Sequence, residues 1–197
     1  MGEGKKLVKT DLMLKYSFTQ DEADFFLEYH TERQIKKRQI ISHPEFLAKN
    51  RFFVVKGAFK SYIMDDDGNL QVINLAICGW DITDNAGYFN KLPGKMFIEA
   101  LEDSIVLQVS FENESFLKTT SHVYEKIFRM LAERNCVFME RRIITCLTKT
   151  AEERYLQFKK EYPEHMKRIP QNAIASYLGM TSQYLSRIKN KQLKKLN

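Results

Sequence analysis

The most specific chemical pattern in the sequence is a group of hydrogen-bonding and basic side chains near its C-terminus. Ser182, Gln183, Ser186, Arg187 and Lys189 have the spacing of one exposed helix face. Glutamine and arginine form paired hydrogen bonds with base edges in the major groove, and lysine pairs with phosphate. The pattern therefore indicates a surface that reads double-stranded DNA.

Small, apolar and capping residues around this face predict the two helices that would hold it. Ala175 is small where two helices would cross, and Gly179 suits the left-handed conformation that ends a first helix. Thr181 or Ser182 would cap a second helix. The apolar faces that hold the helices together come from Ile174, Leu178, Leu185 and Ile188. We predict a helix-turn-helix over 169–188; an ordinary helical hairpin with a polar outer face is the weaker alternative.

The positive charge of the chain lies in the same region. The net charge is +6, from 31 lysines and arginines against 25 acidic residues, and residues 1–149 hold 21 of each sign. The last 30 residues contain no acidic side chain and these basic ones: Arg168, Arg187, Lys189, Lys191, Lys194 and Lys195. Such a module favours a polyanionic partner, nucleic acid or an anionic membrane surface, because binding releases condensed counterions. A solvated basic tail is the other interpretation.

A long helix is predicted over 113–149, and a shorter one over 150–162 that stops before Pro163. The long helix carries two neighbouring apolar rows. One contains Val123, Ile127, Met130, Val137 and Ile144, and the other Tyr124, Phe128, Leu131 and Phe138. One row can pack on the preceding domain while the other pairs with a second copy, so Val123, Ile127, Met130, Leu131, Val137 and Phe138 are candidate dimer residues. Because Arg134 and Arg141 interrupt the first row, a single core-facing stripe in a monomer is equally compatible with the periodicity.

Short strands separated by turns are predicted between Arg38 and Phe111. The expected strands are 39–42, 51–56, 58–64, 70–77 and 104–110, with Gly57 and the sequence 65–69 as turns. Segment 79–96 is expected to be a loop with one short helix. Five or more short strands without long helices between them predict an antiparallel β-roll of the jelly-roll, cupin-like kind.

The remaining sequence offers no catalytic or metal site. A short helix is predicted from Thr19 to near Gln34. The three cysteines lack paired spacing and are expected to be reduced, buried thiols, and the four histidines are expected at the surface. We expect no metal, no cofactor and no enzyme activity. The absence of a leader or a membrane-length apolar run predicts a cytoplasmic protein without membrane association.

The order of these parts resembles the Crp/Fnr family of bacterial transcription regulators. The resemblance covers about residues 18–190 and rests on the strand-turn-strand segment 52–60, the turn at Asp67 and Gly68, the segment 98–101 and the hairpin 169–189. It implies an α+β chain with a cyclic-nucleotide-binding-like β-roll over 1–112, a dimerisation helix over 113–149 and a helix-turn-helix domain over 150–197. The wing found in many relatives is expected to be short or absent.

The resemblance also implies a homodimer on a palindromic operator, and RNA polymerase as a partner if the protein is an activator. By position, Thr181 would touch phosphate, Ser182 and Gln183 would face base edges, and Arg187 would contact base or phosphate. Gln171, at the start of the hairpin, joins them as a candidate DNA-binding residue.

Two features of family members that bind cyclic nucleotides are missing. Their Gly-Glu-Leu loop and phosphate-binding arginine are replaced here by sequences around Asp81 and Lys95. A lysine does not reproduce the two-pronged contact of an arginine. We therefore expect no binding of cyclic AMP. If the protein has another effector, we expect it to bind near Trp80, Asp81 and Lys95.

Two functional hypotheses follow from these patterns. The first is a homodimeric, sequence-specific transcription regulator. The second is a sensor or interaction module in which the β-roll binds a small molecule or protein and the basic C-terminus is a nonspecific anchor. A preference for particular DNA sequences distinguishes the two.

Overall fold

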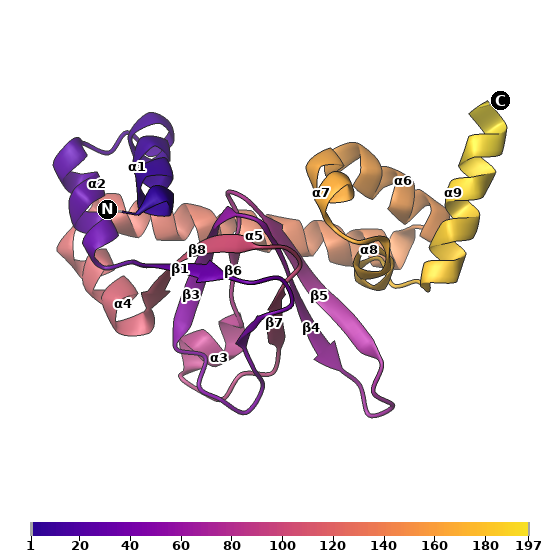
Figure 1. Cartoon of the computed structure of the whole chain (residues 1–197), viewed down its shortest axis with the longest axis horizontal. Coiled ribbons are helices and arrows are strands. Elements are labelled where there is room, and N and C mark those ends of the chain that lie inside the picture. Colours follow the sequence, from indigo (N-terminus) through magenta and orange to yellow (C-terminus); the bar gives the residue numbers. More distant parts are fainter. Residues whose placement is uncertain (1, 197) are drawn as a thin grey trace.

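Two four-stranded antiparallel sheets face each other at the centre of the molecule. The computed structural model describes the backbone of residues 2–196 and the side chains of residues 2–192. The first sheet has the order β1-β8-β3-β6 and the second the order β2-β7-β4-β5. Between them lies a core that includes Phe52, Val54, Phe59 and Ile98. The expected antiparallel β-roll is confirmed (Figure 1).

Most strands occupy the predicted segments. The bounds are β1 Thr31–Ile35, β2 Ile40–Ser42, β3 Asn50–Lys56, β4 Ala58–Met64, β5 Leu70–Ile77, β6 Asp81–Ile82, β7 Phe97–Ala100 and β8 Ser104–Ser110. Segment 79–96 contains the expected short helix, α3 Asn85–Asn90, and the short strand β6 in addition. Strands β4, β5 and β8 begin and end at the predicted residues.

Turn residues define the central hairpins. Gly57 has a φ of 105° between β3 and β4, and a Cβ there would lie 2.0 Å from the Oγ of Ser104. Any other residue at position 57 would therefore clash as well as be strained. Between β4 and β5, the Asp65 side chain accepts a hydrogen bond from the backbone N–H of Asn69 at 2.7 Å.

The N-terminal region differs from the prediction in two ways. Helix α2, Gln20–Glu28, begins as expected at Thr19, which forms a capping box with Glu22, but ends before β1 instead of continuing to Gln34. An additional helix, α1 (Glu3–Tyr16), precedes it. Residues 31–35 form a strand because they pair with β8 along their whole length, which is a tertiary contact that local periodicity does not reveal.

The predicted long helix is two helices. Helix α4, Phe111–Thr120, ends at Ser121, whose side chain then accepts a hydrogen bond at the start of α5, His122–Thr148. Helix α5 runs the length of the molecule, with α1, α2 and α4 at one end and the C-terminal helices at the other (Figure 1). It thereby connects the β-roll to the predicted DNA-reading segment.

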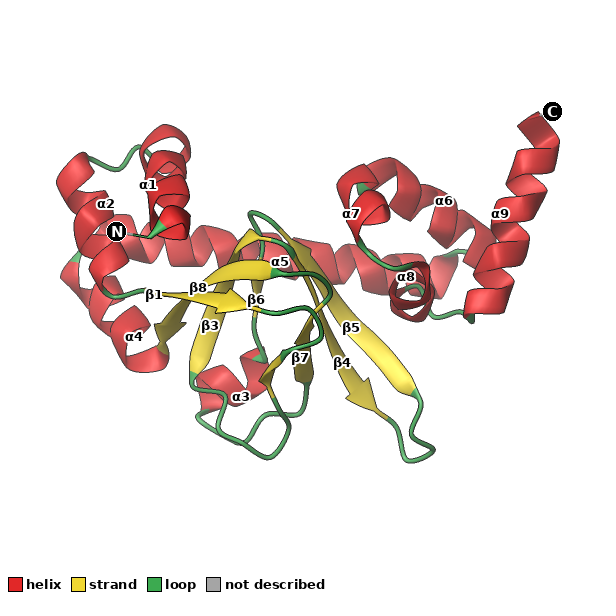
Figure 2. Ribbon diagram, in the orientation of Figure 1, coloured by secondary structure: helices red, strands yellow, loops and turns green. Residues whose placement is uncertain are grey.

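The secondary structure of the C-terminal region is entirely helical in the described residues (Figure 2). Its helices are α6 Ala151–Glu161, α7 Pro163–Arg168, α8 Gln171–Tyr177 and α9 Ser182–Leu196. Pro163 ends α6 as predicted and also starts α7, because a proline is tolerated at the first position of a helix. The backbone after Lys189 continues as helix α9, so no β-wing follows in the described residues. The fold class predicted from the sequence is confirmed.

The expected environments of the cysteines and of two histidines are wrong. Cys78, Cys136 and Cys146 are free and exposed. His30 and His165 are buried among aromatic rings, with exposed fractions of 2% and 3%. Burial disfavours the charged form of both rings, whereas His43 and His122 are exposed as expected.

We expect acid to destabilise the protein through these two buried rings. Burial lowers the pKa of His30 and of His165 to about 4. The unfolded chain protonates both near pH 6.5, so it binds more protons than the folded protein between about pH 6.5 and 4. The free energy of unfolding should therefore fall as the pH is lowered through this window, by up to about 3 kcal/mol for each ring.

Urea unfolding at pH 7 and pH 5 measures this loss. Replacing His165 with Phe, which fits its aromatic surroundings, should reduce the pH dependence. An unchanged pH dependence in His165→Phe would contradict the assignment.

Candidate nucleic-acid interface

The helix-turn-helix geometry arises from the turn between α8 and α9. Gly179 has a φ of 68°, and the N–H of Met180 donates to the carbonyl of Ala175 at 3.0 Å, which closes the end of α8. The hydroxyl of Thr181 then accepts a hydrogen bond from the N–H of Tyr184 at 3.2 Å. Ala175 and Leu185 are almost completely buried where the helices meet. The local chemistry of the sequence thus produces the predicted hairpin.

The candidate DNA-binding side chains lie along α9 and at the start of α8. Gln183, Arg187 and Lys189 are exposed, and Ser182 and Ser186 are half-buried. Gln171 connects the two helices, since its Nε2 donates to the Oγ of Ser186 at 2.8 Å and its Oε1 accepts from Lys189 at 2.9 Å. These bonds hold the middle of the face in a fixed arrangement while Arg187 stays open to a partner.

One exposed residue on this surface was not among the candidates. Tyr184 lies between Gln183 and Leu185 and is 46% exposed. Its position one turn before Arg187 and Ile188 was visible in the sequence. A tyrosine in an apolar hairpin is equally compatible with a place in the core, so the sequence did not identify it as a surface residue. Lys194 and Lys195, counted in the basic tail, have side chains outside the described residues.

The hairpin is held against the β-roll by α8 and α5. The Ser176 hydroxyl donates to the carbonyl of Leu70 at 3.0 Å and accepts from the N–H of Val72 at 2.9 Å. Arg142 of α5 donates to the carbonyls of Val72 and Tyr177 at 3.0 and 2.9 Å, and also to that of Ile73. The outer strand β5 is thus joined by hydrogen bonds to the hairpin of α8 and α9, which we call the reading module.

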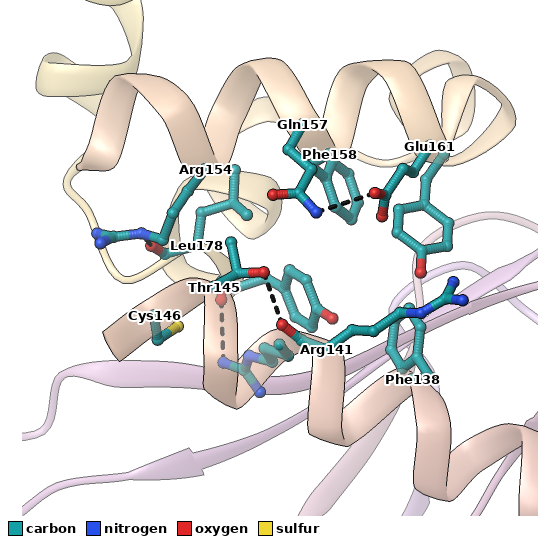
Figure 3. Close-up of a pocket in the computed structure, with 12 residues that line it drawn as sticks. Phe138, Arg141, Thr145, Cys146, Arg154, Gln157, Phe158, Glu161 and Leu178 are labelled. Atoms are coloured by element: carbon teal, nitrogen blue, oxygen red, sulfur yellow. Dashed lines mark hydrogen bonds between the residues drawn. The ribbon is translucent and has the colours of Figure 1, made fainter. Parts of the chain in front are cut away.

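A second junction joins α6 to the hairpin and to α5. Arg154 of α6 donates through Nε to the carbonyl of Leu178 at 2.9 Å. Figure 3 shows the small pocket beside it, with Arg141 and Thr145 on α5 and Gln157 on α6 among its lining residues. Its volume of about 40 Å³ is close to that of one water molecule, so it separates helices without forming a ligand site.

The three candidate effector residues do not share one pocket. Trp80 lines an apolar cavity beside α1, described below. Asp81 is buried and accepts hydrogen bonds from Arg51 at 3.2 Å and from Asn135 at 3.0 Å, so it belongs to an internal ion-pair network. Lys95 is exposed, and its side chain is not part of that cavity.

Asp84 is the N-cap of α3 and gathers several backbone N–H donors of this loop around its side chain. This buried carboxylate accepts hydrogen bonds from the backbone N–H groups of Gly87 at 3.2 Å, Lys95 at 2.5 Å and Met96 at 3.0 Å. Backbone N–H groups arranged in this way are a typical binding site for phosphate. Here the protein's own carboxylate uses them, and it would repel a second anion.

Cyclic AMP is therefore not expected to bind. Titration calorimetry with the purified protein should give no saturable heat, because Asp84 already fills the group of donors and no arginine stands at position 95. Low-micromolar binding of cyclic AMP would contradict this expectation. A cyclic-nucleotide-binding relative titrated in the same buffer serves as the positive control.

The candidate dimer residues divide into two groups on α5. Ile127, Leu131 and Phe138 are buried within the chain, and Val123 is half-buried. Met130 and Val137 are exposed, and the exposed apolar face continues through Ile143, Ile144 and Leu147. The second predicted row is thus buried within the chain, whereas the first row is exposed from Met130 onward, with Ile127 on the buried side.

A β-roll, a long helix and a C-terminal helix-turn-helix in this order define the fold of the Crp/Fnr family of transcription regulators. FixK2 from Bradyrhizobium japonicum matches with a TM-score of 0.73 and 20% identity, over 84% of this chain and 85% of that one. CLP from Xanthomonas campestris, described as a c-di-GMP responsive global regulator, matches with a TM-score of 0.69 and 16% identity, over 87% and 90%.

A third structure, from Eubacterium rectale and assigned to the crp/fnr family, matches with a TM-score of 0.68 and 16% identity, over 92% and 87% of the two chains. No protein-family model matches the sequence, and no curated protein matches it significantly. The predicted resemblance to Crp/Fnr regulators is confirmed at the level of the fold.

The described residues contain neither a membrane-length apolar helix nor a metal-binding cluster. None of their helices is both long and apolar enough to cross a membrane. No group of three or more histidine, cysteine, aspartate or glutamate side chains among them is placed to hold a metal ion.

Proposed function

We propose that the protein is a sequence-specific, DNA-binding transcription regulator of the Crp/Fnr type that acts as a homodimer. The observation that carries the proposal is the exposed polar and basic face of α9, held by the turn at Gly179 and free of acidic residues in the last 30 positions. Helix α9 would enter the major groove, with Ser182 and Gln183 facing base edges and Thr181 and Lys189 facing phosphate.

The exposed apolar face of α5 supports the homodimer. Met130, Val137 and Ile144 recur every seven residues, and Ile143 and Leu147 lie beside them. A seven-residue repeat keeps the same side of a helix facing a partner helix, as in a two-stranded coiled coil. Two copies joined along α5 would present two reading helices related by a two-fold axis, which requires a palindromic operator.

Selection of bound sequences from a random double-stranded DNA pool tests the proposal. The purified protein at near-physiological salt should enrich a two-fold-symmetric motif whose half-sites lie about one helical turn apart. Enrichment of no motif, with or without cell extract, would contradict sequence-specific recognition and leave a nonspecific basic anchor.

Replacing Arg187 with Ala should weaken binding to the selected operator by about 1–3 kcal/mol and relax the preference at one position of each half-site. Arg187 is exposed at the centre of the reading face, so its loss removes a base contact without disturbing the core. Fluorescence anisotropy with operator and random DNA measures both effects.

Two lysine variants provide the comparison. Lys194→Ala should weaken operator and random DNA alike, and Lys160→Ala, an exposed charge on α6, should change neither substantially. Equal losses on both DNAs in Arg187→Ala would argue against a base contact by Arg187.

A further inference from the structure

A partly enclosed apolar cavity of about 330 Å³ lies between α1, β3 and α5. Helix α1 provides Val8 and Leu12, strand β3 provides Phe53 and Val55, and α5 provides Ile127 and Leu131. Cys78, Gly79 and Trp80 line it from the turn between β5 and β6. The additional N-terminal helix therefore forms one wall of a space that the β-roll alone would leave open to solvent.

This cavity lies outside the β-roll. Val55 belongs to the core cluster on the outer face of the first sheet, together with residues of α1, α2, α4 and α5. On the same strand, Phe52 and Val54 belong to the cluster between the two sheets, and Val54 also borders the cavity. Since successive side chains of a strand point to opposite faces, the space beside Phe53 and Val55 is separated from the interior of the roll by the sheet itself.

We propose that this cavity binds one small, uncharged, largely apolar molecule of two or three aromatic rings. An apolar cavity of about 150 Å³ holds benzene, and ligand pockets begin at about 300 Å³. Among the described residues that line the cavity, Asp11 is the only charged one, and it pairs with Lys15 at 2.9 Å. The walls therefore favour apolar contacts and contain no unpaired charge that would bind an ion.

The wall formed by Gly79 and Trp80 connects this site to the C-terminal helices. The Trp80 ring packs edge-on against His165 of α7, with the ring centres 5.3 Å apart, and lies beneath the guanidinium of Arg134 at 4.7 Å. Arg134 also donates to the carbonyl of Gly79 at 3.0 Å. A ligand that displaces this wall changes the contact between the β-roll and α7, so on the proposed function it is an effector of DNA binding.

Fluorescence titration with the neutral apolar probe N-phenyl-1-naphthylamine tests the site. Trp80 is the only tryptophan in the chain, so excitation of tryptophan with emission from the probe reports binding close to the cavity. The wild-type protein should bind one probe molecule per chain with strong energy transfer. Binding of several molecules without a saturable first site would overturn the proposal.

Two variants on the same helix separate the cavity from other apolar surfaces. Val8→Phe fills the cavity and should weaken probe binding about tenfold or more. Leu14→Phe, at a position that is 78% exposed and outside the cavity lining, should leave binding unchanged. Equal binding by both folded variants would place the probe elsewhere.

A chemical measurement covers the case in which Val8→Phe does not fold. In a protein whose Cys136 and Cys146 are replaced by Ser, the probe should slow the reaction of Cys78 with a thiol reagent, because this exposed sulfur lines the cavity. An unchanged reaction rate at saturating probe would exclude occupation of the site.

Regulation is tested separately from binding. Saturating probe should change the affinity for the selected operator about fivefold or more in the wild type and in Leu14→Phe, and not in Val8→Phe. Probe binding with no change in DNA affinity would refute the effector role. A protein that binds probe but no DNA would refute the proposed function and leave the cavity site in place.

Discussion

Replacing Arg51 with Met should lower the free energy of unfolding by about 3–5 kcal/mol. Arg51 is buried in β3, with its Nε 2.8 Å and its Nη2 3.2 Å from the two carboxylate oxygens of Glu114, and its Nη1 3.2 Å from Asp81. Tyr88 also donates to Glu114 at 2.9 Å. Removing the guanidinium leaves two buried carboxylates that have lost their shared positive partner, and this costs far more than the packing that methionine restores.

The pKa of Glu114 follows from the same contacts. Burial by itself would raise this pKa, but the positive charges of Arg51 and Lys118 hold it below its ordinary value. Glu114 is therefore charged in the folded protein and depends on Arg51 to remain so without penalty.

Urea unfolding followed by Trp80 fluorescence and by circular dichroism measures the loss. Lys36→Met is the matched control, because Lys36 and Asp103 form an exposed ion pair, and pairs of this kind contribute little to stability. Similar small changes in both variants would show that the Arg51 cluster is not a stabilising network.

Replacing Ile144 with Asp should convert the proposed dimer into a monomer and weaken binding to a palindromic operator about a hundredfold or more. Ile144 is 52% exposed on the apolar face of α5 in the single chain. In a symmetric dimer each substitution acts twice and places two like charges near the axis, where they are desolvated without a partner. A loss of about 2.8 kcal/mol is sufficient for this hundredfold effect.

Sedimentation velocity measures the assembly, and anisotropy with full and half operators measures the binding. Phe46→Asp is the control, since Phe46 is also an exposed large apolar side chain but does not lie on α5. A variant Ile144→Asp that stays dimeric would rule out pairing along this face. A wild-type protein that is monomeric at micromolar concentration would also rule out pairing along this face.

The parts of the fold that were predicted correctly are those encoded by local chemistry. The reading hairpin was predictable because Gly179 and Thr181 are required by the backbone of the turn itself. Strands β4 and β5 were predictable because the acidic, glycine-containing turn between them separates two clear runs of β-forming residues. In both cases a few adjacent residues determine the structure.

The parts that were missed depend on contacts between distant segments. Thr31–Ile35 has little apolar alternation and is a strand only because β8 pairs with it. Arg51 is one basic residue at the start of an apolar strand, and nothing nearby in the sequence shows that it meets Glu114 and Asp81, 63 and 30 positions away. The apolar cavity combines α1 with β3 and α5, so its existence was not encoded in any single segment.

The hydrogen bonds from Ser176 and Arg142 to strand β5 cover an edge of the second sheet. Strand β5 is the outer strand of its sheet, and these side chains bond to backbone groups that a further strand would otherwise use. An uncovered strand edge is a template for pairing with other chains. A fragment shortened to the β-roll would lose Ser176 and Arg142 from this edge, so it should aggregate unless a charged residue is introduced on β5. The reading module thus also keeps the protein from associating edge to edge.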